Sequence, residues 1–186
     1  MRDESDENLM LRYRDGDAGA FDVLYQRHKG PLYRYLKRML DQDSTTDEIY
    51  QDVWMRVIQA RERYQATAAF RTYLFQIAHN RALDYFRAHQ RQPVHESIDE
   101  SPDGDVADGE QLDVSELVHN QSCAQHLLLL IQRLPVAQRQ VFLLKEEAGL
   151  STAEIAGLTM DNVEAVKSRL RYAIAKLRTG LREFVT

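Results

Sequence analysis

A 25-residue segment without one basic residue divides this chain. Residues 92–116 hold nine of the protein's 29 acidic residues, and Pro93, Pro102, Gly104 and Gly109 interrupt any helix or strand periodicity. A segment this charged and this poor in apolar residues cannot bury enough surface to offset the entropy lost on ordering. We therefore expect a flexible acidic linker, with a separate hydrophobic core on each side of it.

Both flanking parts have the pattern of helices. Residues 32–92 lack proline, and apolar positions recur three or four residues apart, as at Ile49, Val53 and Val57. The fold class is therefore predicted as all-α, with two small helical domains. Within the first domain we expect Gly30-Pro31 to bend or interrupt a helix, and Ser44-Thr45 to cap the start of the next one.

The second part has clear helix boundaries. Leu134-Pro135 ends one helix and allows another to begin, and Gly149 closes that second helix. A capping box at Ser151–Glu154 starts a short helix, and Asp161 is the candidate N-cap of the last one. Two capped helices separated by about three residues are typical of a helix-turn-helix, whose second helix enters the major groove of DNA.

The last helix presents polar and basic side chains opposite its apolar stripe. Between Asn162 and Arg182 there are six basic residues and one acidic residue, Glu164. Arginine can donate two hydrogen bonds to guanine, and lysine suits phosphate. The alternative is an amphipathic surface helix whose basic residues are simply solvated.

A resemblance favours DNA binding. The stretch LPVAQRQVFLLKEEAGLSTAEIAGLTMDNVEAVKSRLRYAIAKLR (Leu134–Arg178) resembles region 4 of the extracytoplasmic-function (ECF) sigma factors of bacterial RNA polymerase. This resemblance implies a domain that reads the −35 promoter element and docks on the polymerase flap. The implied −35 contacts are Lys167, Ser168, Arg169, Arg171 and Tyr172. The turn departs from the family pattern, because Met160-Asp161-Asn162 replaces the frequent Gly-Val-Pro.

The segment TDEIYQDVWMRV (Thr46–Val57) resembles region 2.2 of the same family, which grips the clamp helices of the polymerase. The implied polymerase-binding residues are Asp47, Glu48, Gln51, Asp52 and Trp54. A polar rim around an aromatic anchor is a common design of interface hot spots. The alternative is that Trp54 belongs to the core and that the acidic residues are solvated.

The segment Phe70–Arg91 resembles regions 2.3 and 2.4, which recognise and melt the −10 element. It interleaves aromatic and basic residues, as a surface for unstacked single-stranded DNA requires. The implied −10 contacts are Tyr73, Asn80, Arg81, Asp84 and Arg87. In the family, the loop at the position of Gln65–Ala69 captures a flipped base. Phe70 and Phe75 are equally good candidates for the core.

His119, Cys123 and His126 have a spacing that could serve a metal ion. Without a second cysteine pair, the stronger interpretation is that Cys123 is a small buried apolar residue. We expect no cofactor and no metal. A single cysteine rules out an intramolecular disulfide, and the N-terminus resembles no signal peptide, so we expect a cytoplasmic protein without membrane insertion.

The sequence therefore predicts an ECF sigma factor and not an enzyme. Its predicted domains are residues 1–91 (region 2), 92–121 (the acidic linker) and 122–186 (region 4). Predicted partners are core RNA polymerase, promoter DNA and an anti-sigma factor. The linker is expected either to mimic the charge of RNA inside the polymerase or to act as a solvated tether. A stand-alone helix-turn-helix regulator is the competing hypothesis. An enzyme such as a hydrolase is a third, which no catalytic motif supports.

Overall fold

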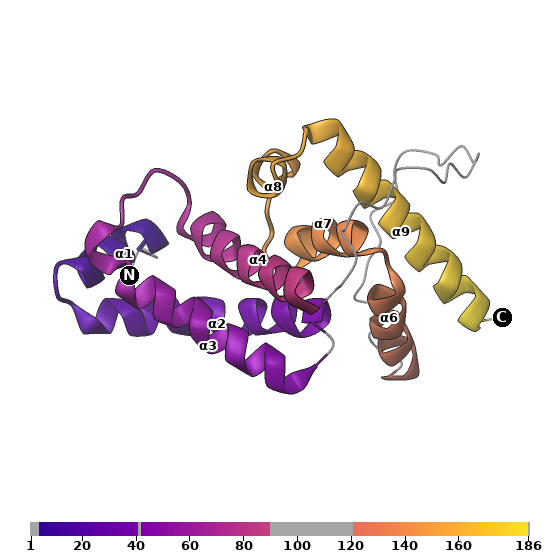
Figure 1. Ribbon diagram of the computed structural model, residues 1–186, viewed down its shortest axis with the longest axis horizontal. Coiled ribbons are helices and arrows are strands. Elements are labelled where there is room, and N and C mark those ends of the chain that lie inside the picture. Colours follow the sequence, from indigo (N-terminus) through magenta and orange to yellow (C-terminus); the bar gives the residue numbers. More distant parts are fainter. Residues whose placement is uncertain (1–3, 41, 90–120, 186) are drawn as a thin grey trace.

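The computed structural model describes residues 4–40, 42–89 and 121–185. These ranges contain α-helices and one short 3-10 helix, and no β-strand is assigned in them. The first half contains α1 (Asp6–Arg14), α2 (Ala18–Leu40), α3 (Asp43–Gln59), the 3-10 turn η1 (Arg61–Arg63) and α4 (Phe70–His89). The second half contains α6 (Gln121–Arg133), α7 (Val136–Glu146), α8 (Thr152–Thr159) and α9 (Val163–Val185) (Figure 1). The predicted all-α fold class is confirmed. The acidic segment 92–116 lies outside the described residues, and the domain boundaries stay a prediction.

Helix α2 is the spine of the first half, because it contacts α1, α3 and α4. It runs without a break from Ala18 to Leu40, so Gly30-Pro31 does not interrupt it. Leu32, Tyr35 and Leu36, just after the proline, are fully buried. This packing holds the second half of the helix in line although Pro31 cannot donate a backbone hydrogen bond.

Helix α3 does not use its expected cap, and α4 is capped by a residue distant in the sequence. Helix α3 begins at Asp43 after Gln42, so the predicted cap at Ser44-Thr45 is wrong; those residues already lie inside the helix. At the start of α4, the carboxylate of Glu7 accepts a hydrogen bond from the backbone N–H of Phe70 at 2.7 Å. This contact joins residues 63 positions apart and fixes the N-terminal end of α4, which follows the 65–69 loop.

The second half follows the predicted boundaries at the end of α7 and the start of α8. Gly149 takes a left-handed conformation (φ 61°) just beyond α7, and Ser151 and Glu154 form a complete capping box at the start of α8. Helix α9 packs along α6, α7 and α8. A Cβ atom at Gly180 would lie 2.6 Å from a methyl group of Leu130, so glycine allows α9 and α6 to approach this closely.

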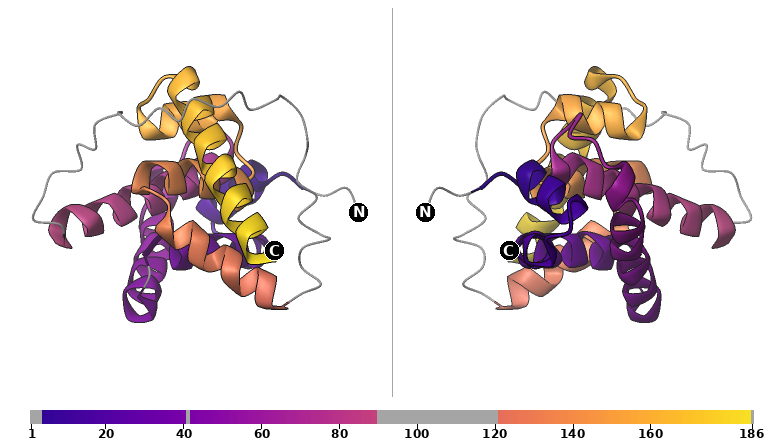
Figure 2. Two further views of the ribbon diagram at one scale, coloured as in Figure 1. Left: turned by 90° about the vertical axis from the view of Figure 1, so that its right-hand side faces the viewer. Right: turned by 90° about the vertical axis from the view of Figure 1, so that its left-hand side faces the viewer.

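The two halves are in contact through α2 and α7, α2 and α6, and α4 and α8 (Figure 2). Glu147 caps the C-terminal end of α7 with its side chain only 6% exposed, and its carboxylate pairs with Arg34 (2.8 Å) and with Arg38. Beside it, Arg139 donates a hydrogen bond to the backbone carbonyl of Met39 in the last turn of α2 (3.2 Å). Charged and polar groups therefore contribute to the contact between the halves, in addition to an apolar cluster whose buried residues come from both halves.

We predict that Glu147→Gln loosens this contact. The amide keeps the shape of the side chain but loses two charge-assisted interactions, which together stabilise the closed arrangement by about 2 kcal/mol. Small-angle X-ray scattering should show a larger radius of gyration than in the wild-type protein. The exposed neighbour Glu146 is the matched control. An equal expansion in Glu146→Gln, or none in Glu147→Gln, would contradict this role.

Candidate nucleic-acid interface

A cavity of about 540 Å³ opens between α3, η1 and α4. Four of the five predicted −10 residues contribute to its lining: Tyr73, Asn80, Arg81 and Asp84. Residues that we did not select from the sequence complete it: Arg56, Gln59, Ala60, Arg63 and Ile77. Arg56, Gln59 and Arg63 are three and four residues apart, which is the spacing of side chains on one face of a helix. This spacing is the sequence pattern from which their shared position could have been predicted. The structure thus brings most of the predicted −10 residues together.

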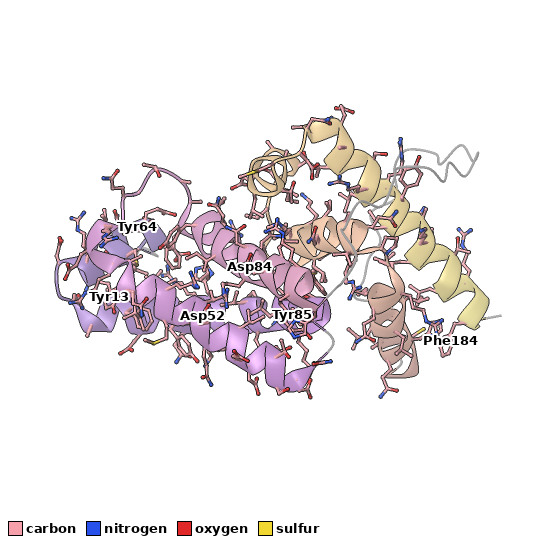
Figure 3. All side chains as sticks on the ribbon, viewed as in Figure 1. Tyr13, Asp52, Tyr64, Asp84, Tyr85 and Phe184 are labelled. Atoms are coloured by element: carbon pink, nitrogen blue, oxygen red, sulfur yellow. The ribbon has the colours of Figure 1, made fainter. Side chains whose placement is uncertain are left out.

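An ionic network crosses this cavity from one helix to the other. Asp52 on α3 lies 2.8 Å from Nε of Arg56 and 2.5 Å from Nε of Arg81 on α4. Asp84 continues the network, 3.4 Å from Arg81 and 3.5 Å from Arg87. Figure 3 shows Asp52 and Asp84 on these neighbouring helices. Arg87, the fifth predicted residue, has a 71% exposed side chain.

The charges of this network are held in place electrostatically. Burial acts to raise the pKa of Asp52, but the two arginines outweigh it and lower that pKa below its usual value. On α4, burial lowers the pKa of His79 to about 4, so this residue is uncharged at neutral pH. The positive charge of the cavity therefore comes from its arginines.

The aromatic residues of α4 divide into two groups. Phe70 and Phe75 are fully buried, as the core interpretation of these two residues required. Tyr73 is half-buried at the cavity, with its ring 5.4 Å from that of Tyr64 in an edge-on contact. All five residues of the Gln65–Ala69 loop are exposed. One aromatic face and an exposed loop are thus available near the start of α4.

On α9 the predicted −35 residues do not all have the same surroundings. Lys167 and Arg171 are exposed, and Ser168 and Tyr172 are half-buried. The guanidinium of Arg171 lies 5.7 Å from the centre of the Tyr172 ring. Arg169 instead pairs with Asp161 in the preceding turn, through one contact of 3.2 Å and a shorter one. Arg169 therefore fixes the turn of the helix-turn-helix against the second helix.

The start of α9 differs from the expected cap. The side chain of Asn162, not Asp161, accepts the backbone hydrogen bond of Ala165 at 2.7 Å. Glu164 has an 82% exposed side chain that pairs with Lys167 at 2.9 Å. Asp161 is already engaged with Arg169, which leaves the capping role to its neighbour.

The outer face of α3 contains the exposed residues Asp47, Glu48 and Gln51. Trp54 is only 5% exposed and contacts the rings of Phe21, Tyr25 and Tyr50, so its core interpretation is the one that the structure shows. Met55, 49% exposed, is instead the large apolar side chain at the surface of this helix. Met55 follows Gln51 by four residues, so the helical spacing alone could have predicted that both lie on the same face of α3.

Two of the three possible metal ligands, Cys123 and His126, lie in the described part of the chain. Among the described residues, no group of three histidine, cysteine or acidic side chains could hold a metal ion. Cys123 is buried, and the ring of His126 stacks on Phe184 with centroids 4.2 Å apart. His119 lies outside the described residues. In the described part of the chain, no helix is both long and apolar enough to cross a bilayer.

Similarity to known proteins covers both halves. Residues 24–92 match the family model "Sigma-70 region 2", and residues 124–177 match "Sigma-70, region 4". The chain is 29% identical over 174 residues to RNA polymerase sigma factor CarQ of Myxococcus xanthus, covering 94% of this chain and 96% of that protein. It is 27% identical to the ECF RNA polymerase sigma-E factor of Escherichia coli strain K12, covering 89% and 88%.

Two solved structures have the same fold. One is CnrH in complex with the cytosolic domain of CnrY, with a TM-score of 0.69, 22% identity and coverage of 97% and 99%. The other is the sigma factor RpoE in complex with the anti-sigma factor NepR from Bartonella quintana, with a TM-score of 0.65, 19% identity and coverage of 87% and 96%.

The turn before α9 offers a test of backbone strain. Met160 has φ 58° and is 93% exposed. Left-handed backbone is unfavourable for any residue with a Cβ atom, and a methionine here makes almost no compensating contact. We expect Met160→Gly to stabilise the protein by about 1 kcal/mol and to raise its melting temperature. Met160→Ala, which keeps the Cβ atom, should not. Equal stabilisation by both would assign the effect to the exposed thioether.

Proposed function

The chain belongs to the ECF group of the sigma-70 family, and from this we propose how its two halves divide the work of initiation. As an ECF sigma factor it binds core RNA polymerase, confers −35/−10 promoter specificity and promotes transcription initiation. One observation supports the assignment of residues to −10 recognition: a single cavity is lined by Tyr73, Asn80, Arg81 and Asp84. We infer that the protein works in the cytoplasm and has no catalytic activity of its own.

The α3–α4 cavity is the proposed site for the −10 element. Its arginines can neutralise phosphate, its amide and carboxylate can read base edges, and Tyr73 offers a face on which a base can stack. Arg87, more exposed along α4, suits the phosphate backbone. The exposed 65–69 loop is the proposed place for a flipped base.

Helix α9 is the proposed −35 reader. Lys167 and Arg171 are exposed and point away from the buried stripe of Val166 and Ala173, so they can reach the major groove. Ser168 and Tyr172 lie beside them. Arg169 contributes mainly by holding the turn through Asp161, which fixes the orientation of the helix on DNA.

The outer face of α3 is the proposed contact to the clamp helices of the polymerase. Asp47, Glu48 and Gln51 provide a polar rim, and Met55 provides an exposed apolar centre. Trp54 supports this face from the core. Region 4 is the proposed contact to the polymerase flap.

An anti-sigma factor is the proposed regulator. The two solved relatives of this fold are each complexes, with CnrY and with NepR respectively. In this chain Leu128 and Leu129 of α6 are 39% and 51% exposed next to each other. An exposed pair of leucines suits the apolar face of a partner helix.

Promoter binding requires the two halves to separate. Elements named −35 and −10 lie about 25 base pairs apart, or about 85 Å along B-form DNA at 3.4 Å per base pair. Here α4 and α8 are in direct contact through the hydrogen bond from Thr72 to Glu154 (2.9 Å). We infer that the described arrangement is a closed form, which opens on the polymerase.

The decisive experiment is transcription by core polymerase with and without this chain. The sigma factor should add promoter-specific initiation, whereas a stand-alone regulator would bind duplex DNA tightly without polymerase. For this assay and the tests below, a promoter can be selected from a random DNA library with the wild-type holoenzyme.

We predict that Lys167→Ala with Arg171→Ala lowers initiation at a −35-dependent promoter by at least about 30-fold, because each lost base contact costs about 1–3 kcal/mol and two are removed. Affinity for core polymerase, measured by fluorescence anisotropy, should change less than twofold. Lys176→Ala removes an exposed charge further along the same helix and is the matched control. A similar loss in Lys176→Ala would show a general effect of charge and contradict the assignment.

A further inference from the structure

Asp52 differs from the other acidic residues of α3. Asp47 and Glu48 are exposed at the surface of the helix, whereas the side chain of Asp52 is 33% exposed and faces two arginines. One of its carboxylate oxygens, Oδ2, lies 2.8 Å from Nε of Arg56 and 2.5 Å from Nε of Arg81. A carboxylate used in this way joins α3 to α4 at the edge of the cavity.

Both arginines line the cavity, and both are held through the same atom. An arginine side chain has several rotatable bonds, and fixing it on a ligand costs rotamer entropy. Nε of Arg56 donates a hydrogen bond to Asp52. Arg81 forms an ion pair with the same carboxylate, and its Nη1 donates a hydrogen bond to Asp84 at 3.4 Å. The orientation of both guanidinium groups is therefore restricted before DNA arrives. Preorganised donors bind with less loss of entropy and keep their angular preference for one base edge.

Asp52 also changes the charge that DNA meets. Without it, Arg56, Arg63 and Arg81 would face the cavity with only Asp84 to offset them. Phosphate attraction is independent of sequence and increases with each uncompensated cation. A carboxylate behind two of the arginines reduces that general attraction and leaves a larger share of the binding to base contacts.

We propose that Asp52 is a positioning residue for the −10 strand and not a contact to the polymerase. It orients Arg56 and Arg81 in the cavity and limits binding of unrelated single strands. This inference rests on the proposed −10 function of the cavity. It departs from the role that the region 2.2 resemblance implies for this position.

The test uses holoenzyme that contains Asp52→Asn. Its probes are two fluorescent single-stranded oligonucleotides of equal composition. One contains the non-template −10 sequence of the selected promoter, and the other contains the same bases in permuted order. We expect affinity for core polymerase within twofold of the wild type. The preference for the −10 strand should fall about five- to tenfold, chiefly because the permuted strand binds more tightly. Binding of that strand should become more salt-dependent, with a log–log slope steeper by about 0.7 for every additional phosphate that the protein neutralises.

Two further variants separate positioning from a merely structural role. Asp52→Glu keeps the negative charge and should restore much of the preference, which a general loss of stability would not allow. Arg81→Gln should remove part of the preference, and adding Asp52→Asn to it should cost less than Asp52→Asn costs alone, because the two changes remove one shared interaction. Additive losses would overturn the proposal.

Control variants on α3 and α4 distinguish a failure of the proposed role of Asp52 from a failure of the proposed −10 function of the cavity. Glu48→Gln, on the proposed polymerase face, should weaken binding to core polymerase without changing strand preference. If Asp52→Asn behaves like Glu48→Gln, Asp52 is a polymerase contact and the inference is wrong. If Asn80→Ala keeps full strand preference, the proposed function of the cavity itself fails. If Asn80→Ala loses the preference and Asp52→Asn keeps it, only the role of Asp52 fails.

Discussion

The buried carboxylate of Glu147 determines how the two halves of the molecule lie against each other. It stands at the C-terminal end of α7, where the helix dipole already disfavours a negative charge, and it is almost completely removed from water. Only the pairs with Arg34 and Arg38 make that position tolerable. An interface of this kind is stable when fully assembled, yet its charged groups are readily hydrated once it separates.

The features that could be predicted from the sequence depend on neighbouring residues. The capping box at Ser151 and the helix end at Gly149 are local patterns. The set of Asn80, Arg81 and Asp84 was instead implied by the family resemblance of Phe70–Arg91, and the structure places all three at one cavity. Contacts between distant segments could not be predicted in this way. Glu7 at the start of α4 and Arg139 at the end of α2 bind backbone groups 63 and 100 residues away. No periodicity contains such pairings.

The cap of α9 was wrongly predicted because two side chains suit that role. Asp161 and Asn162 both suit an N-cap, and the choice depends on Arg169, which engages the aspartate. For Trp54 the sequence left a polymerase contact and a core position open, and three neighbouring aromatic rings account for its burial. On both surfaces proposed to bind DNA, acidic residues accompany the basic ones. This local compensation agrees with a protein that recognises DNA chiefly within a larger assembly.

The residues that pair across the two halves are far apart in the sequence, and this separation affects the order of events during synthesis. Glu147 follows Arg34 by 113 residues. At the usual synthesis rate of about 5–20 residues per second, a ribosome needs roughly 6 to 23 s to travel from one to the other. The first half contains its own core and contacts between consecutive helices, so it can fold within that interval. Every newly made molecule therefore passes through a stage in which α2 presents Arg34 and Arg38 without their partner Glu147, and closure can only follow the synthesis of that residue.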